Sequence, residues 1–158
     1  MTAVTFDRSP LEFRVVDEMW EGPLAAFCEA LIQAGEQRHF HPHPFTLEEV
    51  KKRVQQKGED LYYIAVEGQT VLGYGMLRGW DDGYAVPSLG VAIHPAVRGT
   101  GLGRAFTYFL HAAARRKGAK QVRLKVYPDN AAALNLYRKL GYLFSGQEAG
   151  QLVGYAEL

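Results

Sequence analysis

Residues 98–103 place three glycines at alternate positions, in the order Arg98, Gly99, Thr100, Gly101, Leu102 and Gly103. They separate a stretch that predicts a strand from a stretch that predicts a helix. The first turn of a helix has N–H groups without helical partners and carries the positive end of the helix dipole. Because glycine leaves these groups uncovered, the loop predicts a cradle for a phosphate or pyrophosphate group.

The spacing of the glycines excludes two common nucleotide-binding motifs. A dinucleotide fingerprint that starts at Gly99 needs a glycine where Arg104 stands, and an acidic residue about 20 positions further on, where the chain has a lysine. The P-loop pattern is also absent. The pattern that fits is an Arg or Gln followed by x-x-G-x-[G/A], which Arg98, Gly101 and Gly103 satisfy.

A second segment, residues 130–142, follows the predicted helix and one further strand. Together the two segments resemble the acetyl-CoA-binding core of the GNAT superfamily of N-acetyltransferases. The second is similar to the family's segment N-x-x-A-x-x-L-Y-x-x-x-G-[FY], through Asn130, Ala133, Leu136, Tyr137, Gly141 and Tyr142. The resemblance is specific over residues 86–144, and residues 11–80 support it by arrangement only.

The resemblance implies that acetyl-CoA is the co-substrate. In that family the strand before the glycine loop diverges from its neighbour and hydrogen-bonds the pantetheine arm through its backbone. Val91, Ala92 and Ile93 occupy that stretch here. The amides of residues 98–104 would hold the pyrophosphate, and Arg98 or Arg104 would add charge. A glycine-rich turn that serves only close packing is the alternative.

Asn130 and Ala133 are also expected beside the coenzyme, although Asn130 fits a helix cap better than a ligand. The resemblance places Tyr137 beside the coenzyme sulfur as the general acid. A phenol, with a pKa of about 10, can protonate a departing thiolate. The alternative is a tyrosine packed in the core with its hydroxyl satisfied. The N–H of Val91 or Ile93 is expected to stabilise the oxyanion.

The general base is not assigned by the sequence. Many relatives place a glutamate on the strand before the glycine loop, where residues 86–90 of this chain contain no carboxylate. The candidates are Asp81, Asp82, Tyr84, Ser88 acting through water, and the histidines. Proton removal through a water chain, with no single base, is equally open.

Three histidines alternate in a segment that two prolines keep extended, as His39, His41 and His43. Alternate residues of an extended segment share a face, but no cysteine or carboxylate with ligand spacing completes a metal site, so we expect no metal. The family places this loop over the acceptor site. The residues expected to line that site are His41, His43, Trp80, Tyr84 and Ser88, with a solvated loop and core aromatics as the alternatives.

The composition is that of an ordinary globular protein, with 47% hydrophobic residues, 22% charged residues and a formal net charge of +1. We therefore expect no nucleic acid partner, and the basic cluster at residues 115–117 ends a predicted helix. No run approaches the ~20 apolar residues of a membrane helix, and the N-terminal region lacks a leader's apolar core. Cys28 is the only cysteine and lies in an apolar helical stretch, so it is expected to be a buried thiol in a cytoplasmic protein.

These features favour an enzyme that acetylates a small-molecule amine, an amino sugar or an amino acid derivative, by direct attack on the thioester. A protein N-terminus or lysine is the alternative acceptor. A CoA-binding regulatory module without turnover is the alternative of another class. An acetyl-enzyme is not expected, because the one thiol is expected to be buried.

Hydrophobic periodicity predicts the elements that must position these residues. Strands are expected at residues 11–16, 61–66, 71–78, 86–94, 121–127, 142–145 and 152–157, and helices at 20–34, 47–57, 102–117 and 130–140. This order predicts a single α/β domain over residues 1–158 with a mixed, mostly antiparallel central sheet of about six to seven strands flanked by about four helices. The resemblance implies the acyl-CoA N-acyltransferase fold, and it allows a homodimer in which the final strands pair.

Overall fold

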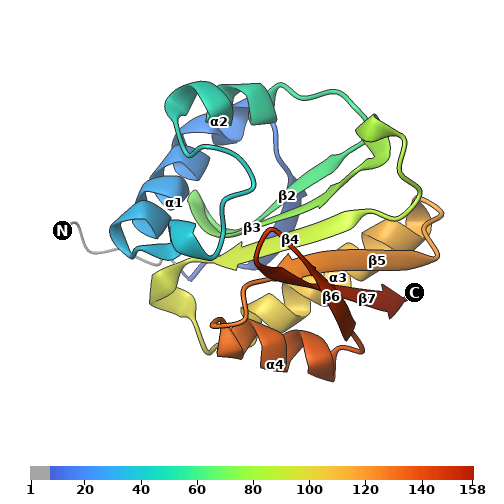
Figure 1. Cartoon of the computed structure of the whole chain (residues 1–158). Helices are drawn as coiled ribbons and strands as arrows, with labels where there is room; N and C mark the ends of the chain where they lie inside the picture. Colours follow the sequence, from blue (N-terminus) through green and yellow to red (C-terminus); the bar gives the residue numbers. More distant parts are fainter. Residues whose placement is uncertain (1–7) are drawn as a thin grey trace.

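The computed structural model describes residues 8–158, and the expectations that concern residues 1–7 lie outside them. Seven strands form one sheet in the order β1-β2-β3-β4-β5-β7-β6 (Figure 1). The strands are β1 (Leu11–Val15), β2 (Leu61–Glu67), β3 (Thr70–Arg78), β4 (Ser88–Ile93), β5 (Gln121–Val126), β6 (Leu143–Glu148) and β7 (Gln151–Glu157). The helices are α1 (Glu21–Gln33), α2 (Leu47–Val54), α3 (Leu102–Arg116) and α4 (Ala131–Lys139).

The sheet is antiparallel except where β4 lies beside β5. Its two faces are covered by different helices (Figure 1). Residues of α1 and α2 pack on Tyr62, Tyr74 and Met76, whereas residues of α3 and α4 pack on the opposite face, against Leu89 and Leu124 among others. The predicted fold class, strand count and order of elements are therefore confirmed.

Helix α3 lies close to the sheet because two glycines of β3 provide the space. Phe106, Leu110 and Ala114 recur every four residues along one face of the helix, and all are fully buried. A Cβ atom at Gly75 would overlap the ring of Phe106, and one at Gly73 would lie 3.2 Å from it. This packing fixes the start of α3, and with it the glycine-rich loop, relative to the end of β4.

The structure confirms the predicted helix caps, and the two largest differences from the predicted boundaries are at the ends of α2 and β6. Thr46 accepts the N–H of Glu49 at 3.2 Å at the start of α2, and Asn130 accepts the N–H of Ala133 at 3.4 Å at the start of α4. Helix α2 ends at Val54 instead of Lys57. Strand β6 continues to Glu148, because the register shifts at a bulge beside Gly146, whose φ is +83°, and pairing then resumes.

Candidate active site

Strands β4 and β5 pair at one position only and then diverge. The register gives a single parallel pair, Ser88 with Arg123, and the N–H of Arg123 donates to the Pro87 carbonyl at 3.0 Å. Beyond this pair, strand β5 continues to Val126 beside β7, and β4 continues to Ile93 beside β3. The two strands therefore open a gap at their carboxyl ends, as the sequence led us to expect.

The backbone groups of Val91 and Ile93 face this gap. The N–H of His94 donates to Leu72 of the β3 side at 2.7 Å, while the Pro87 carbonyl accepts from β5. Because backbone groups alternate in direction along an extended strand, residues 89, 91 and 93 point toward β5. Ala92, which is paired with Tyr74, instead directs its backbone toward β3. Two of the three predicted backbone contacts are thus available to a ligand in the gap, and that of Ala92 is not.

The loop before α3 presents a row of N–H groups with no protein partner. The first helical bond of α3 runs from Ala105 to the Gly101 carbonyl at 3.0 Å, and within residues 8–158 the N–H groups of residues 99–104 bond to no other protein group. Gly99 and Gly101 have φ values of +74° and +85°, which glycine adopts without strain. We therefore retain this loop as the predicted anion-binding site, with backbone N–H groups as its donors.

The two arginines of the loop differ in their partners. Nη1 of Arg98 donates to Oε1 of Glu36 at 2.8 Å, and this ion pair lowers the pKa of the Glu36 carboxyl. Arg104 is exposed on the first turn of α3. The ion pair links the loop to the connection between α1 and α2, whereas within residues 8–158 Arg104 forms no ion pair.

The Tyr137 side chain is buried in the core beneath α4, where its ring meets that of Tyr142 with centroids 5.5 Å apart. Burial raises its pKa to about 12. Among the described residues no group accepts a hydrogen bond from its hydroxyl, unlike Tyr74 and Tyr142, which bond to histidines. This hydroxyl is not among the fully buried polar atoms that lack a partner, so it keeps some exposure and is available to a ligand.

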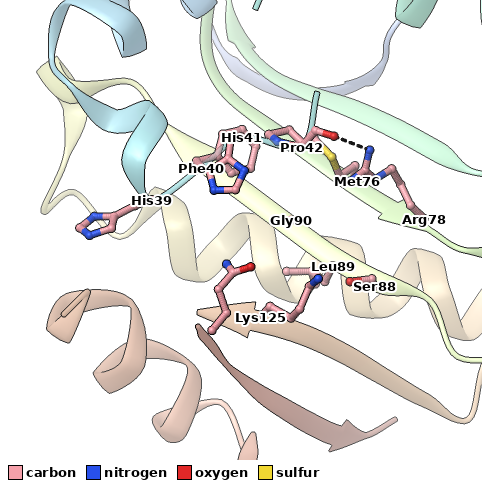
Figure 2. Close-up of a pocket in the computed structure, with 11 residues that line it drawn as sticks. His39, Phe40, His41, Pro42, Met76, Arg78, Ser88, Leu89, Gly90 and Lys125 are labelled. Atoms are coloured by element: carbon pink, nitrogen blue, oxygen red, sulfur yellow. Dashed lines mark hydrogen bonds between the residues drawn. The ribbon is translucent and has the colours of Figure 1, made fainter. Parts of the chain in front are cut away.

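A pocket of about 170 Å³ lies on the α1 and α2 side of β4 (Figure 2). Residues 39–42 of the connection between α1 and α2 cover it, and Ser88, Leu89 and Gly90 of β4 form its floor. The remaining lining residues are Met76, Arg78, Lys125 and Gln151. Of the five residues predicted to bind the acceptor, His41 and Ser88 line this pocket.

The other three predicted acceptor residues lie elsewhere. His43 is buried next to residues 39–42, which cover the pocket, and its Nε2 bonds to the Tyr74 hydroxyl at 2.9 Å. Desolvation lowers the pKa of His43. Trp80 packs with the α3 side of the molecule, under the Lys117 ammonium group. Tyr84 is 66% exposed at the turn after β3. The alternation of histidines did not predict that the third one would turn into the core.

His39 and His41 each bond to the loop that follows β5. Nε2 of His41 lies 2.8 Å from the Tyr127 hydroxyl, and Nε2 of His39 lies 3.1 Å from Oδ1 of Asp129. These contacts join residues 39–42, which cover the pocket, to the loop on the β5 side of the gap between β4 and β5. Neither Tyr127 nor Asp129 was predicted as a site residue from the sequence, where Asp129 was a candidate helix cap and only their place after a strand could have indicated a role at the site.

The acidic candidates for the general base are outside the pocket. Asp81 accepts the N–H of Glu59 at 2.6 Å and that of Asp60 at 3.4 Å, which makes it an anchor for the turn before β2. Asp82 is exposed in the same turn.

Within the described residues no group of three His, Cys, Asp or Glu side chains could hold a metal ion. Cys28 is 1% exposed, and burial raises its pKa to about 12.

The arrangement fits coenzyme A in three respects. Unpaired loop amides suit a pyrophosphate, unpaired groups of Val91 and Ile93 suit the amides of a pantetheine arm, and the Tyr137 hydroxyl suits a sulfur at the end of that arm. A Cβ atom at Gly99 or Gly101 would meet nothing within 4 Å, so the space in front of the loop is open.

Comparison with known proteins identifies the family. A family model described as "Acetyltransferase (GNAT) family" matches residues 24–142, which is most of the chain. The chain therefore belongs to the GNAT acetyltransferase family, and the resemblance inferred from the sequence is confirmed. Within residues 8–158 no helix has the length and apolar character needed to cross a membrane.

A mycothiol acetyltransferase of Thermobispora bispora is 35% identical over 116 residues, which are 66% of this chain and 39% of that protein. The chain thus spans about two fifths of the length of this relative. The crystal structure of PaiA N-acetyltransferase from Thermoplasma acidophilum in complex with coenzyme A matches with a TM-score of 0.78 at 14% identity, over 94% of this chain and 99% of that one. YncA from Salmonella typhimurium, with its cofactor acetyl-CoA, matches with a TM-score of 0.71 at 22% identity, over 95% of each chain. At these identities the structural matches show a shared fold.

Proposed function

We propose that this chain transfers the acetyl group of acetyl-CoA to the primary amine of a small molecule, by direct attack in a ternary complex. The observation that carries the proposal is the gap between β4 and β5, where the backbone groups of Val91 and Ile93 have no strand partner beside a small pocket. The unpaired amides of residues 99–104 lie at the end of the same strand.

The coenzyme would be held mainly by backbone groups. The loop amides bind the pyrophosphate, and Arg98 and Arg104 add positive charge beside it. The pantetheine arm takes the place of a strand between β4 and β5. Bound in this way, acetyl-CoA supplies an activated acyl group on a thioester, and the fold brings it to the floor of the acceptor pocket.

The amine attacks the thioester carbon, so that a C–N bond forms and the C–S bond breaks. The N–H of Val91, which faces the gap, stabilises the negative charge that develops on the carbonyl oxygen. The Tyr137 hydroxyl gives its proton to the departing thiolate. Because burial raises the pKa of Tyr137 to about 12, the phenol stays protonated at neutral pH and keeps the proton that it donates.

The acceptor must also lose a proton. His39 and His41 both line the pocket, and Nε2 of His41 bonds to the neutral Tyr127 hydroxyl, whereas Nε2 of His39 bonds to the Asp129 carboxylate. A neutral imidazole nitrogen can accept a proton, and we choose His41 for this role. We assign it the role of receiving the amine's proton, directly or through a water on Ser88. Asp81 is already engaged by backbone N–H groups and does not take part.

The size of the pocket supports a small acceptor. Its volume of about 170 Å³ is below the roughly 300–1,000 Å³ that holds a drug-sized ligand. The name of the relative from Thermobispora bispora, a mycothiol acetyltransferase, also refers to a small molecule.

The test is acceptor-dependent release of the free thiol of CoA, measured with a panel of small amines, amino sugars, amino acids and short peptides, with mass spectrometry of the products. The proposal predicts release with small amines and a mass increase of one acetyl group. If acetyl-CoA binds in calorimetry and no amine increases thiol release, the chain is a coenzyme-binding module. If only peptides are acetylated, the small-molecule assignment is wrong.

A further inference from the structure

The acceptor pocket contains two cationic side chains and no carboxylate. Arg78 enters it from the end of β3 and Lys125 from β5, so the two lie on opposite sides of β4 (Figure 2). Among the described residues that line the pocket there is neither an aspartate nor a glutamate. A pocket for an amine that had no other charge would be expected to show the opposite sign, because a protonated amine is repelled by these groups.

Arg78 is held in place by a neutral group. Its Nη1 donates to the Pro42 carbonyl at 2.8 Å, which fixes the guanidinium against the segment that covers the pocket. Within residues 8–158 no carboxylate lies within ion-pair distance of it, although the other guanidinium N–H groups remain as donors. The charge of Arg78 is therefore uncompensated by the protein.

The positive charge of Lys125 is compensated only in part by the protein. Its Nζ lies 3.9 Å from Oε2 of Glu148, at the limit of an ion pair. The same carboxylate accepts two bonds from Nη2 of Arg123, both at 3.1 Å. Because Glu148 is shared in this way, the pocket keeps a net positive charge from Arg78 and Lys125.

We propose that the acceptor amine carries a carboxylate, which Arg78 and Lys125 bind. This inference rests on the proposed acetyltransferase function and names the class of its substrate. A guanidinium matches a planar carboxylate with two parallel N–H donors, and the ammonium of Lys125 adds a second charge. Phe40, Pro42 and Met76 supply an apolar wall for a small side chain. Together these features fit an amino acid or a close derivative with a free carboxylate.

The test compares matched acceptors in steady-state thiol-release kinetics. Each set consists of an L-amino acid, its amide, and the aminoalkylphosphonate with the same side chain. The wild-type protein is expected to prefer the amino acid over the amide by about 10-fold or more in kcat/KM. In Arg78→Gln that kcat/KM is expected to fall about 10- to 100-fold for amino acids, mainly through KM, and to change less than about threefold for amides.

Two further variants separate recognition from folding. Arg78→Lys retains a donor for the Pro42 carbonyl and a positive charge, so it should recover part of the loss. Arg116→Gln removes an exposed arginine at the far end of α3 and should leave kcat/KM unchanged for all three acceptors. Calorimetry with acetyl-CoA checks that each variant is folded, and each should bind the coenzyme as the wild type does.

The outcomes distinguish this inference from the function on which it rests. Equal use of amino acids and amides, or equal losses for both in Arg78→Gln, overturns the carboxylate site. Preference for the phosphonates overturns it in favour of a phosphate-bearing acceptor. If no amine is used at all, the proposed function fails, and titration of N-acetyl amino acids into the CoA complex tests the site alone: binding that is lost in Arg78→Gln supports the site, and no binding overturns it.

Discussion

Three buried tyrosines differ in whether their hydroxyl groups have a protein partner. Tyr137, Tyr74 and Tyr142 are all buried, but histidine side chains bond to the hydroxyls of the latter two. The Tyr137 hydroxyl has no protein partner among the described residues and is not one of the fully buried polar atoms that lack a partner, so a ligand can reach it. The sequence pattern around Tyr137 indicated the residue, but only the packing showed that its hydroxyl is unpaired.

Buried histidines make the stability of this protein depend on pH. The pKa values of His43, His94 and His111 are all lowered by desolvation. The neutral rings are therefore favoured in the folded state, and their contribution is complete above the unfolded-state pKa of about 6.5 and declines as the pH falls below it. We expect the midpoint of thermal unfolding to decrease by several degrees between pH 7 and pH 5, on the order of 2–4 °C for each kcal/mol lost.

The variant His111→Gln isolates one of these groups. Glutamine keeps a polar partner for the Tyr142 hydroxyl, which lies 2.6 Å from Nε2 of His111, but it does not titrate. The decrease in unfolding midpoint between pH 7 and pH 5 should therefore be smaller than in the wild type. Tyr142→Phe is the control, since it removes the hydrogen bond and keeps the titrating ring. An unchanged pH dependence in His111→Gln would contradict this account.

At the scale of the elements, the start of α3 is the predicted coenzyme site and its end is a natural control. Gly101 and Gly118 flank the same helix with φ values of +85° and +94°. Alanine at either position should destabilise the protein by about 1 kcal/mol, because neither backbone conformation suits a residue with a Cβ atom. Only Gly101→Ala should also weaken acetyl-CoA binding, by about 10-fold in calorimetry. Equal effects on binding by both variants would show that the loop does not hold the coenzyme.

The turn after β3 was a candidate for catalysis and is now assigned to structure. Asp81 accepts backbone N–H groups of the segment before β2, whereas within residues 8–158 the side chain of its neighbour Asp82 forms no hydrogen bond or ion pair. Asp81→Ala is expected to lower the free energy of unfolding by about 1–2 kcal/mol, as loss of a capping carboxylate does, with kcat within about twofold of the wild type. Asp82→Ala should change neither quantity. Denaturant unfolding and thiol-release assays measure both, and a large loss of kcat in Asp81→Ala alone would restore it as a catalytic candidate.

The whole molecule shows why the coenzyme side was more predictable than the acceptor side. Residues 98–104 and 130–142 are local segments whose spacing is visible in the sequence, and the order of elements follows from periodicity. The proposed acceptor pocket instead combines residues 39–42 with two positions of β3, three of β4 and one each of β5 and β7. Which side chains meet there depends on strand register and on the point at which β4 and β5 separate, and neither is encoded in a short motif.

The connection between α1 and α2 links the two halves of the candidate site. Glu36 bonds to Arg98 beside the glycine-rich loop, while His39 and His41 bond to the loop that leads to α4. The pocket is therefore bounded by the same loops that we propose to contact the coenzyme. This arrangement agrees with a mechanism in which both substrates are bound before transfer.

The central claim is tested most directly by thiol release from acetyl-CoA in Tyr137→Phe and the wild type, at saturating acceptor. Removal of one hydroxyl should lower kcat by about 10²-fold or more, as expected for loss of a general acid, while the affinity for acetyl-CoA stays within about twofold. Tyr108→Phe, which alters an exposed tyrosine of α3, is the control and should retain full activity. A Tyr137→Phe protein that binds acetyl-CoA and turns over at the wild-type rate would contradict the account.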